Sequence, residues 1–144
     1  MEEFSTPLLV DAGPRENLLD LLAARVAGTG DGPLIEYKTP GTGTTWHTVS
    51  AREFDRQVRD VARGFVARGI APGDRVGIMS RTRYEWTLLD WALWSAGAVP
   101  VPVYETSSAE QVHWILTDAA VTLLVVETAE HAATVAEVRP EAPL

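Results

Sequence analysis

From Arg75 onward the chain alternates short apolar runs with longer segments in which apolar residues recur every three or four positions. The short runs have the length of strands, and the longer segments have the spacing of helices. The predicted strands are 75–79, 98–104 and 121–126, and the predicted helices are 84–96, a segment that begins at Ser107 or Ser108, and 128–138. This alternation is typical of parallel strands joined by right-handed helical crossovers, and the nearly continuous apolar strands indicate a sheet covered on both faces.

The first half of the chain predicts a helix, a β-hairpin and a second, longer helix. Leucines and a valine at helical spacing predict the first helix over 17–27. The runs 34–38 and 44–49 are short, partly β-branched and separated by a Gly-rich stretch, which is typical of a hairpin. The expected fold class is α/β, with a β-hairpin followed by β-α-β-α-β-α units whose strands are parallel.

Ser50 predicts the start of the longer helix because Glu53 follows three residues later. That spacing is typical of a capping box, in which each side chain accepts a hydrogen bond from a backbone N–H of the first turn. Gly69 predicts the end of this helix. Its apolar stripe consists of Phe54, Val58, Val61 and Phe65, with Ala62 and Val66 beside it. Its polar face places two ion pairs one turn apart, Asp55 with Arg59 and Arg56 with Asp60.

Pro100 and Pro102 lie inside the predicted strand 98–104. Proline has no backbone N–H, and residues two apart direct their N–H groups to the same side of a strand. One side of this strand therefore cannot donate hydrogen bonds at these positions. We expect an edge strand or a local break in the ladder.

Composition narrows the classes of protein to which the chain can belong. A net charge of −8 argues against a nucleic-acid surface, which needs clustered cations. The lack of cysteine excludes a disulfide framework and a thiolate metal site. The longest apolar run, 119–126, is much shorter than the roughly 18 residues of a membrane span. The acidic N-terminus differs from a secretory signal, so a cytoplasmic location is expected.

The sequence stops directly after the last predicted helix, with no closing element. Its 144 residues are enough for one domain with a real core and too few for two. We therefore expect a fragment of a longer protein, with an unpaired sheet edge that favours association of the isolated chain.

The stretch TPGTGTT, residues 39–45, has the composition of a phosphate-binding loop. A Walker loop ends in Gly-Lys-Ser/Thr, a dinucleotide loop needs a third glycine, and both lead into a helix. Here Trp46 and a predicted strand follow the stretch, and Lys38, the only lysine of the sequence, precedes it. We interpret TPGTGTT as a hairpin connection rather than a nucleotide site.

Two turns that follow predicted strands are candidate sites, because ligands of parallel sheets bind at the carboxyl ends of strands. In the turn 80–83, Arg81 and Arg83 could bind an anion at the N-terminus of the next helix, but we favour a solvated helix cap. After Tyr104, the turn 105–108 offers a carboxylate and hydroxyl groups, which ligand contacts and helix capping explain equally well.

The histidines and most tryptophans have simple structural interpretations. The histidines, which lack the spacing of a metal site and are interpreted as surface or core residues, are His47, His113 and His131. The tryptophans interpreted as helix residues that pack in the core are Trp86, Trp91, Trp94 and Trp114. Because no Ser/His/Asp set and no paired carboxylates stand out, the residues alone predict no catalytic centre.

The longest distinctive stretch is GDRVGIMSRTRYEWTLLDWALWSAGAVPVPVYETSSAEQVHWILTDAAVTLLVVE, residues 73–127. It resembles the N-terminal region of AMP-forming acyl-CoA synthetases, and most closely that of the bacterial long-chain fatty acid–CoA ligases. The part from Met79 to Leu116 is specific, since α/β packing alone would not produce so long a run. The preceding TWHTVSAREFDRQVRDVARGFVARGIAPGDRV is similar to the family's opening, a hairpin strand, a helix and Gly-x-x-x-Gly-Asp-x-Val.

The resemblance implies a two-step reaction. A carboxylate attacks the α-phosphate of ATP to give an acyl-adenylate and pyrophosphate, and the thiol of CoA then displaces AMP. The implied substrates and cofactors are a fatty acid, ATP, Mg²⁺ and CoA, with no nucleic acid. A homodimer and peripheral association with the inner face of the membrane are compatible with the resemblance.

In the family, the phosphate loop, the ribose-binding acidic residue, the adenine-binding strand and the catalytic lysine all lie further along the chain. Residues 1–144 therefore correspond to the N-terminal portion of the large AMP-binding domain, without the phosphate loop and the C-terminal domain. The resemblance assigns no catalytic, cofactor-binding or metal-binding residue within them, and the isolated fragment is expected to be inactive.

Two alternatives remain open. The first is a ligase for another carboxylate, such as a short-chain, aryl or amino acid, because the acyl pocket of the family is built mostly downstream. The second is a non-catalytic α/β binding module. A phospho-receiver module would have acidic residues at strand ends where this sequence has Met79–Ser80 and Tyr104–Glu105, which disfavours that form of it.

Overall fold

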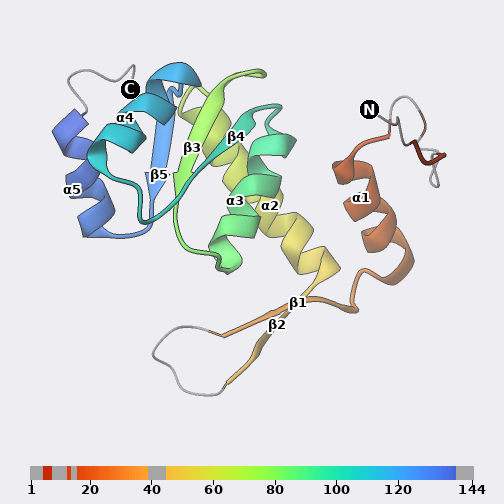
Figure 1. The fold of residues 1–144 in the computed structure, drawn as a ribbon. Coiled ribbons are helices and arrows are strands. Elements are labelled where there is room, and N and C mark those ends of the chain that lie inside the picture. Colours follow the sequence, from red (N-terminus) through yellow and green to blue (C-terminus); the bar gives the residue numbers. More distant parts are fainter. Residues whose placement is uncertain (1–4, 8–12, 14–15, 39–44, 139–144) are drawn as a thin grey trace.

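Ten helices and strands lie within the part of the chain that the computed structural model describes, residues 5–7, 13, 16–38 and 45–138 (Figure 1). In chain order they are α1 Leu18–Thr29, β1 Pro33–Tyr37, β2 His47–Ser50, α2 Ala51–Ala67, β3 Arg75–Met79, α3 Tyr84–Ser95, β4 Val99–Val103, α4 Ala109–Asp118, β5 Leu123–Val126 and α5 Ala129–Val138. The strands form an antiparallel pair, β1–β2, and a parallel sheet of order β4-β3-β5. The predicted α/β class is confirmed.

β3 is the central strand of the parallel sheet, paired with β4 on one side and β5 on the other. Val76 and Ile78 are fully buried, as expected for a strand covered on both faces. Gly77 leaves room for the neighbouring strand, because a Cβ at this position would overlap Cδ1 of Leu124.

β4 is an edge strand in the described part of the sheet, as its prolines predicted. Val99 donates its backbone N–H to the carbonyl of Asp74, beside β3, at 2.8 Å. N–H directions alternate along a strand, so Val101 also faces β3, whereas Pro100 and Pro102 fall on the outer side. The two prolines therefore remove no hydrogen-bond donor from the β3–β4 ladder.

Helices cover both faces of the parallel sheet (Figure 1). On one face, Phe65 of α2 and Leu93 of α3 belong to the core cluster that contains Ile78. On the other face, Leu116 of α4 packs in the cluster of Met79, and part of α5 packs against the same cluster. This arrangement confirms the covered sheet predicted from the apolar strands.

The hairpin and α1 are attached to the sheet domain through a third cluster. Leu22 of α1, Val49 of β2 and Phe54 of α2 are buried together. Tyr37 of β1 stacks on Tyr84 of α3 with ring centroids 4.4 Å apart. The predicted hairpin is confirmed by the antiparallel pairing of β1 and β2. Residues 39–44 of the TPGTGTT stretch lie outside the described residues.

The start of α2 corrects one prediction. Ser50 Oγ accepts a hydrogen bond from the backbone N–H of Glu53 at 3.2 Å. The Glu53 carboxylate, however, accepts hydrogen bonds from Arg56 and Gln57, so the predicted capping box is only half formed. A guanidinium is a stronger donor to a carboxylate than a neutral backbone N–H. Gly69 ends the helix with a φ of +92°, as predicted.

Complete capping boxes occur at two other helices. At α1, Asn17 and Asp20 cap each other's backbone N–H groups, which the sequence analysis did not single out. At α4, Ser108 pairs with Gln111, which decides between the two predicted starts of this helix. The predicted ion pairs of α2, Asp55–Arg59 and Arg56–Asp60, are both present.

Candidate functional site

The carboxyl ends of the three parallel strands meet at one edge of the sheet, where ligands of such sheets bind. The segments at this edge begin at Ser80 after β3, Tyr104 after β4 and Glu127 after β5. We call it the carboxyl edge. It carries two features, a cluster of charged residues around Glu127 and an open hollow beside α4.

The Glu127 cluster consists of Ser80, Arg81, Arg83 and Glu127, and it joins the ends of β3 and β5. The Glu127 side chain is only 5% exposed. Its carboxylate accepts hydrogen bonds from Arg81 Nη2 at 2.8 Å, from the Arg81 backbone N–H at 2.9 Å and from Arg83 Nη1 at 3.0 Å. Sequence analysis missed Glu127, although a lone carboxylate directly after an apolar strand was a signal for it.

The donors around Glu127 hold it in the charged form. Hydrogen bonds from the Arg81 side chain, and then from the Arg81 backbone, lower the pKa of Glu127 to about 2, against the effect of burial. Ser80 Oγ lies 3.2 Å from Glu127 Oε2, but a carboxylate with so low a pKa is too weak a base to activate a hydroxyl at neutral pH. The cluster therefore fixes two strand ends and does not form a nucleophile–base pair.

The arginines of the turn 80–83 are matched by carboxylates of this same chain. Arg83 binds Glu85 at 2.6 Å in addition to Glu127, so two guanidiniums face two carboxylates and no cation is left over for an anionic ligand. The interpretation as a solvated cap is wrong for Arg83. It occupies the N-cap position of α3 without a side-chain capping bond, because its guanidinium is held by charged partners instead.

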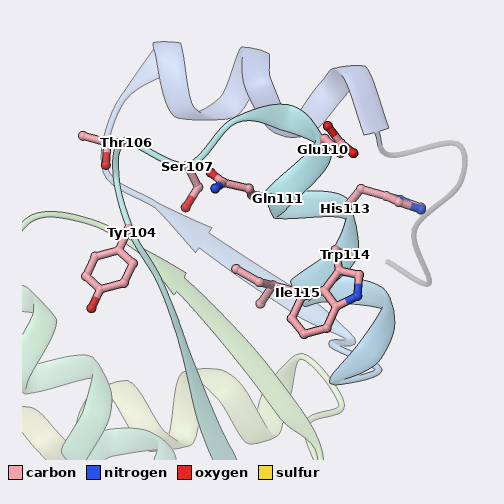
Figure 2. Close-up of a pocket in the computed structure, with 8 residues that line it drawn as sticks. All are labelled: Tyr104, Thr106, Ser107, Glu110, Gln111, His113, Trp114 and Ile115. Atoms are coloured by element: carbon pink, nitrogen blue, oxygen red, sulfur yellow. The ribbon is translucent and has the colours of Figure 1, made fainter.

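The second feature of the carboxyl edge is an open hollow of about 780 Å³ (Figure 2). Its lining comes from the β4–α4 turn and from α4, and consists of Tyr104, Thr106, Ser107, Glu110, Gln111, His113, Trp114 and Ile115. Tyr104 lies on one side of it and Trp114 with Ile115 on the other (Figure 2). The hydroxyl groups of the turn 105–108 were predicted either to contact a ligand or to cap the helix. Ser108 caps α4, whereas Thr106 and Ser107 line the hollow.

The hollow does not fit a nucleotide. The charged side chain in its lining is Glu110, whose negative charge would repel a polyphosphate. Within the described residues, no group of three or more His, Cys, Asp or Glu side chains could hold a metal ion. The Nδ1 atoms of His113 and His131 are buried without a hydrogen-bond partner. The hollow can offer aromatic and hydroxyl contacts, but no phosphate or Mg²⁺ site.

The structure separates Trp114 from Trp86 and Trp91, which pack against core clusters. Trp91 packs edge-on against the buried Phe54 with ring centroids 5.9 Å apart, as predicted for a core residue. Trp94 is half-buried and packs edge-on against Trp91 at 5.5 Å. Trp114 is 65% exposed, which contradicts the core interpretation. Val112 and Leu116, two positions to either side of Trp114, are buried in the core. A helix turns by roughly 200° over two residues, so Trp114 lies on the side of α4 that faces away from the core.

No helix in the described part of the chain combines the length and apolar character required to cross a bilayer.

Comparison with known proteins identifies the family. A sequence model of the AMP-binding enzyme family matches residues 22–144. The long-chain-fatty-acid–CoA ligase FadD15 of Mycobacterium bovis is 39% identical over 143 residues, which make up 99% of this chain and 23% of that protein. The chain therefore spans about a quarter of the length of this curated relative.

Solved structures show the same fold. A long-chain-fatty-acid–CoA ligase from Archaeoglobus fulgidus superimposes with a TM-score of 0.83 at 20% identity, over 99% of this chain and 29% of that one. An anthranilate CoA ligase in complex with anthranoyl-AMP superimposes with a TM-score of 0.76 at 19% identity, over 89% of this chain and 23% of that one. Since the family match covers most of the sequence, the chain belongs to the AMP-binding enzyme family.

Proposed function

We propose that residues 1–144 are the N-terminal portion of the large AMP-binding domain of a long-chain fatty acid–CoA ligase, ahead of the phosphate loop and the C-terminal domain. The observation that carries this proposal is the 39% identity to FadD15 along 99% of the chain. The α/β arrangement shared with the Archaeoglobus fulgidus ligase supports it at the level of the fold.

The reaction proposed for the whole protein converts ATP, a fatty acid and CoA into acyl-CoA, AMP and pyrophosphate through an acyl-adenylate. Mg²⁺ would offset the charge of the phosphates. The described residues do not fit ATP or Mg²⁺, since the arginines of the carboxyl edge are already paired and the lining of its hollow includes Glu110. We therefore propose no catalytic, cofactor-binding or metal-binding role for any of the described residues.

The role proposed for this region is that of a scaffold. β3 supplies a central strand that is buried from Val76 to Met79, and the Glu127 cluster fixes the ends of β3 and β5 at the carboxyl edge. A rigid edge of this kind positions the loops and domains that bind ligands, because catalytic geometry must be held to within a fraction of an ångström.

Residues 1–144 purified alone should show no fatty-acid-dependent exchange between ATP and pyrophosphate. A chimera in which residues 1–144 replace the aligned 143 residues of FadD15 should show exchange and form acyl-CoA from long-chain acids, with intact FadD15 as the reference. Exchange by residues 1–144 alone would contradict the assignment of the reactive groups elsewhere. A folded chimera that activates no acid would contradict the scaffold role.

A ligase for another carboxylate is the second candidate, and the fold likeness to an anthranilate CoA ligase favours it. Acids of different chain length and aromatic acids, offered to the full-length protein, separate the two candidates. A stand-alone binding module is the third candidate. Specific binding of labelled ATP by residues 1–144 in equilibrium dialysis would favour that module over a scaffold.

The proposed location is the cytoplasm, with peripheral association at the inner face of the membrane. The support is the lipid-like character of the proposed substrate, which partitions into bilayers. A homodimer is proposed as the assembly, and no nucleic-acid partner is expected at a net charge of −8. Cell fractionation and sedimentation of the full-length protein test these proposals.

A further inference from the structure

The hollow beside α4 is lined by electron-rich groups. Two of its aromatic side chains lie largely in solvent, since Tyr104 is 80% exposed and Trp114 is 65% exposed, and they stand on opposite sides of the hollow (Figure 2). Glu110 adds a carboxylate, and Thr106 and Ser107 add hydroxyl groups. No lysine or arginine is among the described residues that line the hollow. Such a lining favours a cation that also donates hydrogen bonds.

Glu110 supplies the negative charge of the hollow. The carboxylates of Glu85 and Glu127 at the same edge of the sheet are held by arginines of this chain. None of the ion pairs in the described part of the chain includes Glu110, which is exposed in the first turn of α4. A carboxylate without an internal partner attracts a cation from outside, and the net charge of −8 extends that attraction over a longer range.

The spacing of Glu110 and Trp114 suits a guanidinium group. The two residues are one turn apart on α4, which places their Cβ atoms about 5–6 Å apart on the helix surface. A planar guanidinium can lie flat on the indole ring while its N–H groups reach the carboxylate. An ammonium group is a hydrated point charge that neither stacks nor binds a carboxylate in a bidentate way, so the pair prefers arginine to lysine.

Hydrogen bonds hold the two sides of the hollow in place. Ser107 donates its backbone N–H to the carbonyl of Tyr104 at 3.0 Å, which closes the turn after β4. The capping box of Ser108 and Gln111 then fixes the start of α4. The backbone that carries Tyr104 and the exposed face of α4 is therefore organised before a ligand arrives, which lowers the entropic cost of binding.

We propose that this hollow is a docking surface for a partner protein, which places an arginine side chain against Trp114 and Glu110. Tyr104 then covers the apolar stem of the arginine or the residue beside it. A pocket for a small molecule encloses roughly 70–90% of its ligand, whereas this hollow is open, so a protein segment is the better occupant. Tryptophan, tyrosine and arginine also carry much of the binding energy at protein interfaces. The inference does not depend on the reaction proposed above.

Titration of residues 1–144 with a capped tripeptide, an arginine between two leucines, tests the proposal. The matched peptide contains citrulline, which has nearly the shape of arginine but no charge. We expect the citrulline peptide to bind about 5–30-fold more weakly, because the cation–π contact and the ion pair are both lost. NMR shifts of the backbone amides locate the contact, which should lie within residues 104–115. Equal affinities of the two peptides, or shifts centred elsewhere, would overturn the inference.

Two pairs of variants separate the hollow from general effects of charge and of exposed rings. Glu110→Gln removes a charge from the hollow, and Asp118→Asn removes one from the other end of α4. Trp114→Leu removes a ring from the hollow, and Trp46→Leu removes an exposed ring elsewhere. The variants in the hollow should each weaken binding of the arginine peptide by about 2–5-fold, and the controls should leave it unchanged. Controls that weaken binding equally would contradict the proposed site.

The FadD15 chimera shows whether the hollow stays accessible in the longer protein. Saturation-transfer NMR, observed on the peptide, should detect the arginine peptide on the chimera and a weaker signal with Glu110→Gln. If residues 1–144 bind the peptide and the folded chimera does not, the longer protein covers the hollow itself, and the assignment to a partner protein fails. A chimera that binds the peptide but activates no acid retains the docking surface and loses the proposed reaction.

Discussion

Glu127 joins the ends of β3 and β5 through two arginines, so its charge should contribute to the stability of the fold. Glu127→Gln keeps the shape of the side chain and removes the charge. We expect a loss of about 1.5–3 kcal/mol in the free energy of unfolding, typical of hydrogen bonds to a charged group. The loss should fall toward the lower value, because Arg81 is 62% exposed and solvent screens its charge. Denaturant titration measures it, with the exposed Glu137→Gln as control.

The same contact predicts how stability depends on pH. Hydrogen bonds from Arg81 lower the pKa of Glu127 from 4.5 to about 2 in the folded chain. A lowered pKa stabilises the folded state fully above the unfolded value of 4.5, and the contribution is lost as the pH falls toward 2. The stability difference between the parent chain and Glu127→Gln should therefore shrink between pH 6 and pH 3. A difference that stays constant over this range would contradict the assignment.

Residues differ in how far their environment could be predicted from sequence. Trp114 could have been placed on the surface from the sequence, since Val112 and Leu116 lie one helical turn apart and Trp114, halfway between them, falls on the opposite side of the helix. The contact of Arg81 with Glu127 could not have been predicted in the same way. The two residues are 46 positions apart, and only the strand order β4-β3-β5 brings them together.

At the scale of elements, two glycines should respond in opposite ways to alanine. Gly97 follows α3 with a φ of +75°, and a Cβ there would lie 3.1 Å from Cβ of Pro72. Gly97→Ala should lower the free energy of unfolding by about 1–2 kcal/mol. Gly64 lies within α2 with nothing within 4 Å of an added Cβ, so Gly64→Ala should raise it by up to about 1 kcal/mol. Thermal and denaturant unfolding report both signs, and a stabilising Gly97→Ala would contradict the strained turn.

Element types could be predicted from periodicity, whereas their ends depended on local hydrogen bonds. Strand β3 coincides with the predicted range 75–79. Strand β5 begins at Leu123, two residues later than predicted, because Val121 donates its N–H to the carbonyl of Leu116 and still belongs to the end of α4. Burial of Val121 made it look like part of the strand. An apolar run alone does not separate a helix end from the strand that follows.

At the scale of the whole molecule, the outer edge of β5, which faces away from β3 and has no strand partner in the described part of the chain, predicts how the isolated chain behaves in solution. An apolar groove of about 350 Å³ lies beside this edge, between β5 and α5. An edge strand beside an apolar groove pairs readily with another copy, and a lysine at such an edge opposes the pairing. Residues 1–144 should therefore self-associate with rising concentration, as measured by sedimentation velocity. Thr122 lies at the start of this edge and lines the groove, so Thr122→Lys should shift the association to higher concentration.

Thr117→Lys is the matched control for this prediction, because Thr117 is also exposed but lies on α4, outside the groove. Both substitutions change the net charge from −8 to −7, so repulsion between whole molecules changes equally. A difference between the two variants then reports the position of the lysine and not its charge. If they associate alike, the contact between copies does not use β5, and its outer edge would have to be protected in some other way.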